Sequence, residues 1–507
     1  MDAGSIALSV LVPVFNERYL VAESLARLAI LEDHPNLSRI EVIVVDDGST
    51  DGTAQSLSAF AQERAQSGGR IQWRFLTHEH NAGKGKAIQT ALALATGDAC
   101  IIHDADLEYH PADIARMITA YLANDADAVF GSRFTGSEVR RVLLYRHQLA
   151  NKLLTLICDL VSNLNLTDVW TCYKMVRTEL LKSIPLSSND FQIEPELTIK
   201  LAKREARIFE IPISYFGRTY REGKKIRARD GLLALFAILR FGVSDQIYRA
   251  DEYGSQILAR LSRAPRFNLW MADAIRPFCG DRVLEIGSGV GNLSRALLPR
   301  QHYVASDINP LYLQTLTNLS AERPYLRASF CDVSDLASFP AHAQGYDTVI
   351  CLNVLEHVDD AQQSLLNIKS VLAPNGRAIV LVPQGPKNFG TLDEVLGHRR
   401  RYTRGTLTEL GTQCGMKVRA MLEFNRMGTV AWWLNGRLLR RRRFGLAQIW
   451  VLNLITPLMR ALDGVLPIAP LSLIAVMEPD PEVMATGRDV AGASPHSSTE
   501  PAIPVRG

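Results

Sequence analysis

The chain has 507 residues, of which 47% are hydrophobic and 21% are charged, and its formal net charge is +3. The length alone suggests about three domains, and so small a charge argues against a dedicated nucleic-acid binder. The seven cysteines are scattered without metal-binding spacing, which is typical of reduced thiols rather than of a disulfide framework. No apolar run reaches the roughly 20 residues of a membrane span, and no basic segment of a secretory signal precedes the first one. We therefore expect a cytoplasmic protein.

Apolar runs alternate with segments of helical spacing through the first 240 residues. The expected strands cover residues 9–14, 40–45, 72–76 and 100–106. This alternation predicts an α/β domain with a parallel sheet and with helices on both of its faces. Right-handed crossovers then place the loops that follow the strands at one edge of the sheet. Those loops hold the polar and glycine-rich segments of this half of the chain.

Two carboxylates one residue apart end the fourth expected strand. Asp104 and Asp106 follow an apolar run, and residues i and i+2 of an extended chain point the same way. The pair could therefore present its oxygens to one hard cation, Mg²⁺ or Mn²⁺, which would neutralise a diphosphate. The alternative is an acidic strand end without function, because Asp is common in turns.

The loops after the second and third strands add features of a nucleotide site. Residues 46–53 begin with two aspartates, and an acid at a strand end can accept hydrogen bonds from a base or a ribose. Residues 81–86 contain Gly83 and Gly85 but lack the spacing of a P-loop. Together with the acid pair, these loops predict a site for a nucleotide diphosphate.

Several segments resemble, in order and spacing, the motifs of family 2 glycosyltransferases with the GT-A fold, and most closely the dolichyl-phosphate mannose/glucose synthase group. The segments are 12–17, 45–53, 81–86, 104–106, 168–174, 191–196 and 218–226. The resemblance implies a Rossmann-like domain that uses a nucleotide diphospho-sugar. It assigns the nucleotide to Pro13, Glu17 and Asp47, and the metal to Asp104, Asp106 and Glu108.

Two classes of acceptor remain open for such a transfer. A sugar hydroxyl needs a general base, for which Glu194 or Glu196 is the candidate. A polyprenyl phosphate needs cations instead, and arginine pairs well with phosphate. The candidate cations are Lys84, Arg133, Arg140, Arg141, Arg146, Arg218, Arg221, Lys224 and Lys225. The resemblance favours the phosphate, with inversion at the sugar, and the amphipathic segment 232–239 could lie against the bilayer.

The second half has its own glycine turn. A helix over 267–278 precedes a strand that ends at Ile286, and Gly287, Gly289 and Gly291 follow in G-x-G-x-G spacing. Such a turn suits a ligand that approaches the backbone closely. The next strand ends at Asp307, about 20 residues on, where an acid would meet ribose hydroxyls. The G-x-G-x-x-G spacing of dinucleotide-binding proteins is absent.

These segments resemble the motifs of class I methyltransferases that use S-adenosylmethionine. The resemblance implies a second Rossmann-like domain, and its cofactor residues would be Glu285, Gly287, Gly289, Gly291, Asp307, Asp332 and Asn353. A base matters only for some methyl acceptors, and His357 and His398 are candidates for it, with a structural role as the alternative.

We therefore predict a bifunctional enzyme with a glycosyltransferase domain at 5–240, a linker at 241–261, a methyltransferase domain at 262–480 and a disordered tail at 481–507. Basic clusters beside the apolar segment 444–462 suit an anionic membrane surface, or else cap a pocket. The protein would be cytoplasmic, with the membrane face as a second location. The alternative is a glycosyltransferase for hydroxyl acceptors whose second domain modifies the product or only binds a partner. Patterns of this kind leave the oligomeric state open.

Overall fold

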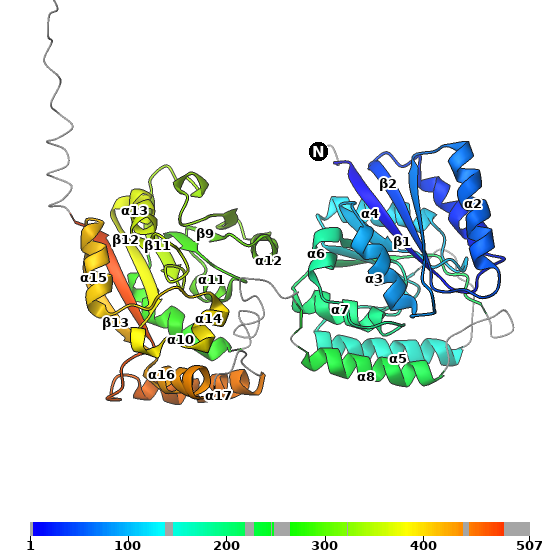
Figure 1. Ribbon diagram of the computed structural model, residues 1–507. Helices are drawn as coiled ribbons and strands as arrows, with labels where there is room; N and C mark the ends of the chain where they lie inside the picture. Colours follow the sequence, from blue (N-terminus) through cyan, green and yellow to red (C-terminus); the bar gives the residue numbers. More distant parts are fainter. Residues whose placement is uncertain are drawn as a thin grey trace, which may run out of the picture. The chain divides into compact units, whose positions relative to one another are not determined.

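The computed structural model describes residues 4–136, 145–218, 228–244, 246–247, 264–321, 323–439 and 446–480 (Figure 1). Contacts divide the chain into two compact units, Met1–Asp251 and Glu252–Gly507. Within the described ranges, each unit contains one seven-stranded sheet. The expected tail, and the expected linker beyond residues 241–244 and 246–247, lie outside these ranges.

The first sheet has the order β3-β2-β1-β4-β6-β5-β7. Its strands are β1 (Ile6–Val14), β2 (Leu37–Asp46), β3 (Ile71–Thr77), β4 (Ala99–Ile102), β5 (Ala128–Ser132), β6 (Lys174–Arg177) and β7 (Ile208–Pro212). The first four strands are parallel, as predicted, whereas β6 runs antiparallel to both β4 and β5. The sheet is therefore mixed rather than wholly parallel, and β5, β6 and β7 are not among the strands expected from the sequence.

Register brings the predicted loops of the first unit to one edge. Val14 lies opposite Asp46, and Leu11 lies opposite Ile102. The chain moves outward from β1 to β3 and then returns to the other side of β1 as β4, so the strand order reverses between β1 and β4. Open α/β sheets bind ligands outside the carboxyl ends of the strands at such a point. The fold thus places the loops after β1, β2 and β4 where a ligand is expected.

Helices cover this sheet, and three of them form a separate layer. The helices are α1 (Val21–Arg27), α2 (Thr53–Ser67), α3 (Lys84–Leu94), α4 (Ala112–Ala123), α5 (Tyr145–Ser162), α6 (Thr178–Ser183), α7 (Ile193–Lys203) and α8 (Ala228–Val243). Figure 1 shows α5 and α8 side by side, next to α7. The three share a buried apolar cluster that includes Cys158, Ile199 and Ile238.

The second sheet has the order β10-β9-β8-β11-β12-β14-β13. Its strands are β8 (Arg282–Ile286), β9 (His302–Asp307), β10 (Leu326–Phe330), β11 (Tyr346–Leu352), β12 (Leu372–Pro383), β13 (Met416–Phe424) and β14 (Ser472–Pro479). All pairings from β10 to β12 are parallel, and β14 is antiparallel to both of its neighbours. The strand order reverses between β8 and β11, so this sheet has a binding edge of the same kind.

Helices of the second unit connect most of its strands. They are α10 (Pro265–Ile275), α11 (Asn292–Leu297), α12 (Pro310–Ser320), α13 (Ala361–Ser370), α14 (Thr391–Leu396), α15 (Arg404–Gln413), α16 (Arg426–Trp433) and α17 (Leu446–Leu462). The helix expected over 267–278 ends as an α-helix at Ile275, and a 3₁₀ turn continues to Phe278. Pro277 explains the change, because proline has no N–H to donate within a helix. None of the helices in the described ranges has the length and apolarity that crossing a bilayer requires.

Candidate functional sites

The predicted acid pair of the first unit lies in a turn rather than in a strand. β4 ends at Ile102, so the strand expected through residue 106 is shorter, and Leu107 has a φ of 63°. The argument from an extended chain therefore does not hold for Asp104 and Asp106. Both still follow β4 at the binding edge of the sheet, where they meet acids and cations from other loops.

Arg218 is the centre of an acidic cluster formed by Glu17, Asp106 and Glu108. Its guanidinium lies 3.0 Å from Asp106 Oδ2, 3.2 Å from Glu108 Oε1 and 3.6 Å from Glu17 Oε1. The Tyr215 hydroxyl donates a hydrogen bond of 2.7 Å to Glu108. Residues from three separate segments therefore surround one positive charge.

Asp104 has a different cation. Lys84 Nζ lies 2.9 Å from Asp104 Oδ2. Burial alone would raise the pKa of Asp104, but the Lys84 ammonium holds it below its ordinary value. Burial and the nearby charges of Asp104 and Glu108 raise the pKa of Asp106 to about 7. A cation that binds at Asp106 would therefore stabilise the ionised form of this carboxylate.

The donor chemistry of this cluster fits a divalent cation. Its ligand atoms are carboxylate oxygens, from Glu17, Asp104, Asp106 and Glu108, and oxygen is what Mg²⁺ and Mn²⁺ prefer. The resemblance assigns three of these acids, Asp104, Asp106 and Glu108, to a metal. The fourth, Glu17, is one that it assigns to the nucleotide.

Asp47 holds a loop in this structure. It is buried, and its carboxylate accepts hydrogen bonds from the N–H groups of Ala82 (3.0 Å) and Gly83 (2.7 Å). His78 Nδ1 lies 2.7 Å from the same carboxylate. Pro13, the other residue assigned to the nucleotide, lies in β1 opposite Val45. Asp47 therefore ties the loop after β2 to the loop after β3, which the sequence did not indicate.

The glycines of the 81–86 loop have a packing role. A Cβ on Gly83 would lie 2.2 Å from the carbonyl oxygen of Asn189, and one on Gly85 would lie 2.4 Å from that of Ser188. The N–H of Lys86 donates to the Asn189 carbonyl at 3.0 Å. This loop thus packs directly on the backbone that precedes α7.

Replacing Gly83 with Ala should therefore destabilise the protein by about 2–3 kcal/mol, because the new methyl group has no room and because φ is +97°. Thermal and denaturant unfolding of the full chain would measure the loss. Gly231→Ala is the matched control, since a Cβ there meets nothing within 4 Å in a helix. The control should leave stability unchanged or slightly higher. Equal behaviour of the two variants would contradict the packing role.

Glu194 and Glu196, the candidate bases, are both occupied by lysines. Glu194 lies on α7 between Lys174, which forms a short buried ion pair with Oε2, and Lys84, whose Nζ is 3.3 Å from Oε1. Glu196 lies 2.6 Å from Lys200 Nζ. Burial would raise the pKa of Glu196, but hydrogen bonds from Lys200 and Ser188 hold it below its ordinary value. Lys174 ends the 168–174 segment, but the resemblance assigns no role to it.

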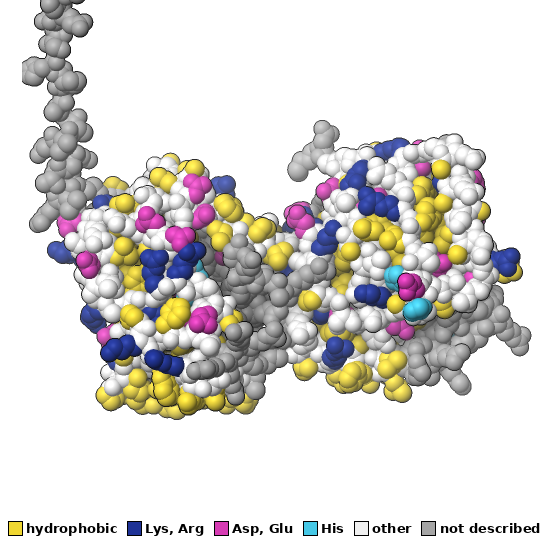
Figure 2. Space-filling view, viewed as in Figure 1, with side chains coloured by type: hydrophobic (Ala, Val, Ile, Leu, Met, Phe, Trp, Pro, Cys, Tyr) yellow, Lys and Arg dark blue, Asp and Glu magenta, His cyan; other side chains and the backbone are white. Residues whose placement is uncertain are grey.

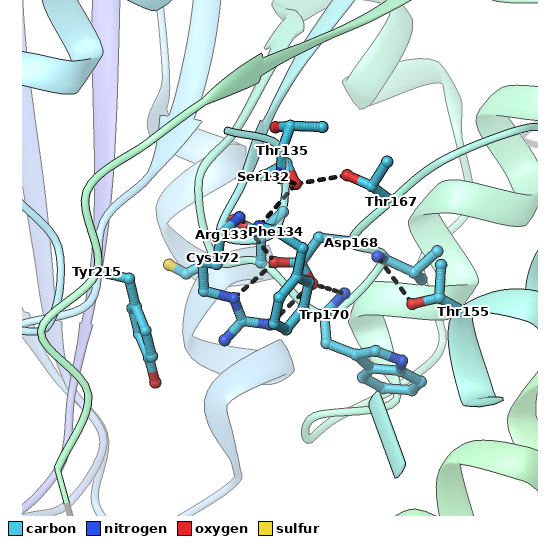
Figure 3. A network of polar contacts seen from close by, with 12 residues as sticks. Ser132, Arg133, Phe134, Thr135, Thr155, Thr167, Asp168, Trp170, Cys172 and Tyr215 are labelled. Carbon is cyan, nitrogen blue, oxygen red and sulfur yellow. Dashed lines mark hydrogen bonds and ion pairs between the residues drawn. The ribbon is translucent and has the colours of Figure 1, made fainter. Parts of the chain in front are cut away.

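Arg133 is bound to an acid of its own unit. Figure 3 shows its guanidinium directed at the buried Asp168, with Nε 2.6 Å from Oδ2 and Nη2 2.8 Å from Oδ1. The ring of Tyr215 packs on the other side, 4.9 Å away. This arrangement fixes Arg133 between β5 and the 168–174 segment. Arg140, Arg141, Arg221, Lys224 and Lys225, and the side chain of Arg146, lie outside the described residues.

The glycine turn of the second unit has the backbone that its sequence predicts. Gly287, Gly289 and Gly291 have φ values of 73°, 56° and 80° between β8 and α11. A Cβ on Gly287 would lie 2.5 Å from the side chain of Val354. Asp307, at the end of β9, accepts a hydrogen bond of 2.8 Å from the N–H of Gly289. The turn and the acid therefore form one structure at the binding edge.

The other residues assigned to the cofactor divide into two groups. Glu285 is buried within the sheet and accepts hydrogen bonds from Ser294 and from Tyr303 (2.8 Å). The carboxylate therefore links β8 to α11 and to β9. Asp332 and Asn353 follow β10 and β11 at the same edge as Asp307. Asn353 has a φ of 54°, which directs the chain away from the strand. A small adenosine-type ligand fits this set, because acids and open glycine backbone meet there.

His357 and His398 are neighbours in the fold, with ring centroids 4.9 Å apart. His398 Nδ1 lies 2.9 Å from Asp393 Oδ1, and Asp393 also binds Arg401 and Trp432. Burial and the charge of His398 lower the pKa of His357 to about 4. The sequence named both histidines but gave no sign of Asp393, although His398 and Arg401 follow it within eight residues and Trp432 comes from a distant segment.

Two family models match the chain, one in each unit. The model described as glycosyl transferase family 2 matches residues 9–184, and the model described as a methyltransferase domain matches residues 284–378. The first match includes the acids Glu17, Asp104, Asp106 and Glu108 but not Arg218. The second includes the glycine turn, Asp307, Asp332 and Asn353.

Individual proteins and solved structures are similar to parts of this chain. The uncharacterized protein MJ0544 of Methanocaldococcus jannaschii is 29% identical over 214 residues, which are 40% of this chain and 86% of that protein. Glycosyltransferase AglJ of Haloferax volcanii is 26% identical over 215 residues, 42% of this chain and 64% of AglJ. Among solved structures, the glucosyl-3-phosphoglycerate synthase from Mycobacterium tuberculosis with Mn²⁺, UDP and phosphoglyceric acid has a TM-score of 0.37 and 20% identity, over 47% of this chain and 79% of that one. With one family matched in each unit, this chain is an enzyme that joins a glycosyltransferase family 2 domain to a methyltransferase domain.

Proposed function

We propose that the first unit transfers a sugar, with inversion, from a nucleotide diphospho-sugar to a polyprenyl phosphate or a related membrane-linked acceptor, and that the second unit transfers a methyl group from S-adenosylmethionine. The observation that carries the first half is the cluster of Glu17, Asp104, Asp106 and Glu108 at the point where the strand order reverses. We infer that the nucleotide-sugar donor binds at this edge, because open α/β sheets bind ligands where the strand order reverses.

Asp104 and Asp106, with Glu108, would hold a divalent cation in this proposal. When bound, the cation supplies a Lewis acid for the departing diphosphate, which is worth several kcal/mol. The acids of the cluster outnumber Lys84 and Arg218, which pair with them, and a divalent cation would balance the remaining negative charge. These side chains would position the donor and exclude water from it.

The state of the two candidate bases supports a phosphate acceptor. A hydroxyl acceptor must lose a proton to a base, but the oxygens of Glu194 face Lys84 and Lys174, and Glu196 is bound to Lys200. A phosphate acceptor is already ionised near neutral pH and needs no base. The hydroxyl acceptor remains the second candidate.

An apolar surface on the first unit supports an acceptor in a membrane. Along α5 and α8, exposed apolar side chains recur at spacings of three and four residues: Tyr145, Leu149, Leu153, Leu156 and Leu160 on the first helix, and Leu232, Phe236, Leu239 and Val243 on the second. Figure 2 shows hydrophobic side chains gathered over these helices. Both helices pack on α7, which carries Glu194. Helices of this kind lie in the membrane interface.

The double variant Leu153→Glu with Phe236→Glu should bind anionic lipid vesicles at least tenfold more weakly. Burial of each apolar side chain in the lipid is worth about 1.5–3 kcal/mol, and the variant loses both contributions. Vesicle co-sedimentation of the full chain would measure the change. Ile30→Glu, at an exposed apolar residue of the same unit but on another element, is the control and should bind as the parent does. Equal binding of all three proteins would count against a membrane-bound acceptor.

Labelled nucleotide sugars offered with Mn²⁺ test the transfer itself. Uridine and guanosine donors should each be tried with a polyprenyl phosphate and, separately, with sugar hydroxyl acceptors. The proposal expects the label on the polyprenyl phosphate. Transfer to hydroxyl acceptors alone would establish the second candidate instead.

Calorimetric titration with S-adenosylmethionine tests the second unit. The glycine turn and Asp307 lead us to expect saturable binding. Absence of binding would favour the rival in which this unit only recruits a partner.

A further inference from the structure

Among the residues that the structure describes, a buried carboxylate of the second unit has no hydrogen-bond partner. Glu356 has a relative exposure of 0%, and neither of its side-chain oxygens has a hydrogen-bond partner among the residues that the structure describes. It lies just beyond β11, three residues after Asn353. A buried polar group without a partner costs free energy. Such a residue needs an explanation in terms of what it faces.

Glu356 faces two histidines whose tautomers are set by other groups. His398 Nδ1 lies 2.9 Å from Asp393 Oδ1, and His357 Nδ1 lies 3.3 Å from the carbonyl oxygen of Gly397. An N–H at Nδ1 satisfies both contacts and leaves the lone pair of each ring on Nε2. Histidines that bind metals have this arrangement, in which the other ring nitrogen donates to a carboxylate or a backbone carbonyl.

The three side chains converge on one point. One ligand atom from each of Glu356, His357 and His398 lies within 4.8 Å of the other two, and His398 Nε2 is 3.9 Å from Glu356 Oε1. Ligands around an ion at about 2.1 Å are roughly 3 Å apart, so small side-chain rotations would complete the site. His398 is held firmly meanwhile, because Arg401 and Trp432 fix the Asp393 carboxylate behind it.

We propose that Glu356, His357 and His398 bind a divalent cation beside the glycine turn, and that this cation holds an oxygen of the methyl acceptor. Two imidazoles and one carboxylate suit Zn²⁺, Mn²⁺ or Fe²⁺ and leave coordination positions open. The second clause rests on the proposed methyl transfer. It commits the acceptor to a hydroxyl compound, such as a sugar with neighbouring hydroxyls.

A cation at this position would activate a hydroxyl acceptor without a free base. Coordination makes the hydroxyl more acidic, and its proton passes to solvent water. The oxygen then forms a bond to the methyl carbon while the bond between that carbon and sulfur breaks. The electron pair of the broken bond stays on sulfur, which leaves as a neutral thioether.

Mn²⁺ binding by the full chain tests the site directly. The parent for this experiment carries Asp104→Asn and Asp106→Asn, so that the acids of the first unit do not contribute. Electron paramagnetic resonance of free Mn²⁺ should then reveal one ion bound per chain. His357→Gln with His398→Gln should abolish that binding, and Glu356→Gln should weaken it at least tenfold.

A second histidine pair in the same unit provides the matched control. His302 and His342 have ring centroids 4.8 Å apart, yet they are not part of any three-residue ligand group in the described chain. His302→Gln with His342→Gln should bind Mn²⁺ as the parent does. Mn²⁺ should also raise the unfolding temperature of the parent but not that of the His357/His398 variant. The variant's own cooperative unfolding transition without Mn²⁺ checks that it is folded.

The outcomes separate this site from the proposed methyl transfer. Mn²⁺ binding that is unchanged in the His357/His398 variant, or absent from the parent, overturns the cation site. If the same preparation still binds S-adenosylmethionine in the calorimeter, the proposed methyl transfer survives that result. Mn²⁺ binding without S-adenosylmethionine binding would support the cation site and overturn the methyl transfer. If Glu356→Gln lost methyl transfer but bound Mn²⁺ as tightly as the parent, the role of the cation in methyl transfer would be overturned.

Discussion

Replacing Asp104 or Asp106 with Asn should reduce cation-dependent sugar transfer by at least about a hundredfold, since the Lewis acid supplies several kcal/mol. Asn keeps the shape of the side chain but removes the negative charge. In Asp104→Asn, Lys84 would lose its 2.9 Å ion pair, and in Asp106→Asn, Arg218 would lose its 3.0 Å pair. Transfer from a labelled donor over a range of Mn²⁺ concentrations would measure the loss.

Methyl transfer by the same variants should remain at the level of the parent, because the second unit has its own sheet and its own binding edge. Asp33→Asn, at an exposed acid of the first unit, is the control and should leave both activities unchanged. Full sugar transfer by Asp104→Asn and Asp106→Asn would remove the cation from the proposal. Loss of both activities would point instead to misfolding or to tight coupling of the two units.

Replacing Asp307 with Ala should lower the affinity for S-adenosylmethionine by about ten- to a hundredfold. Each hydrogen bond to a charged acceptor is worth roughly 1.5–3 kcal/mol, and the ribose hydroxyls would lose theirs. The structure adds a second cause, because Asp307 also accepts the N–H of Gly289 and so supports the glycine turn. Isothermal titration calorimetry of the full chain would measure the change.

Asp281→Ala is the matched control for this measurement. Asp281 is an exposed acid just before β8, at the opposite end of the strand from the glycine turn, and its replacement should leave the affinity unchanged. An affinity that is also unchanged in Asp307→Ala would exclude the ribose role. In that case the carboxylate would serve only to hold the turn.

Much of both folds could be predicted because parallel strands buried on both faces are continuous apolar runs. The runs before residues 15, 46 and 103 therefore identified β1, β2 and β4, and right-handed crossovers brought their loops to one edge. The acid pair was found on the same basis, although β4 proved shorter than expected. The antiparallel directions of β6 and β14 could not be predicted, because β6 was not expected as a strand and because the side-chain pattern of a strand is the same in either direction.

The sequence named candidate site residues but not the partners that the structure gives them. Asp104, Asp106, Asp307 and the glycines of the second unit follow strands, and local spacing identifies such residues. The ion pair of Lys174 with Glu194 and the hydrogen bond from Trp432 to Asp393 depend on how separate segments meet. Arg133 was expected to bind phosphate, and only the folded chain places Asp168 against it.

The sequence by itself determined that this chain has two α/β domains, where the first strands of each sheet lie and which loops carry acids and glycines. These features depend on local periodicity and on the backbone freedom of single residues. The tertiary structure alone decided which charges are compensated: Arg218 joins three acids, lysines occupy the two candidate bases, and Glu356 is left facing two histidines. The physical reason is that an ionic or hydrogen-bonded contact is decided by the distance between atoms in space, which spacing along the chain does not determine.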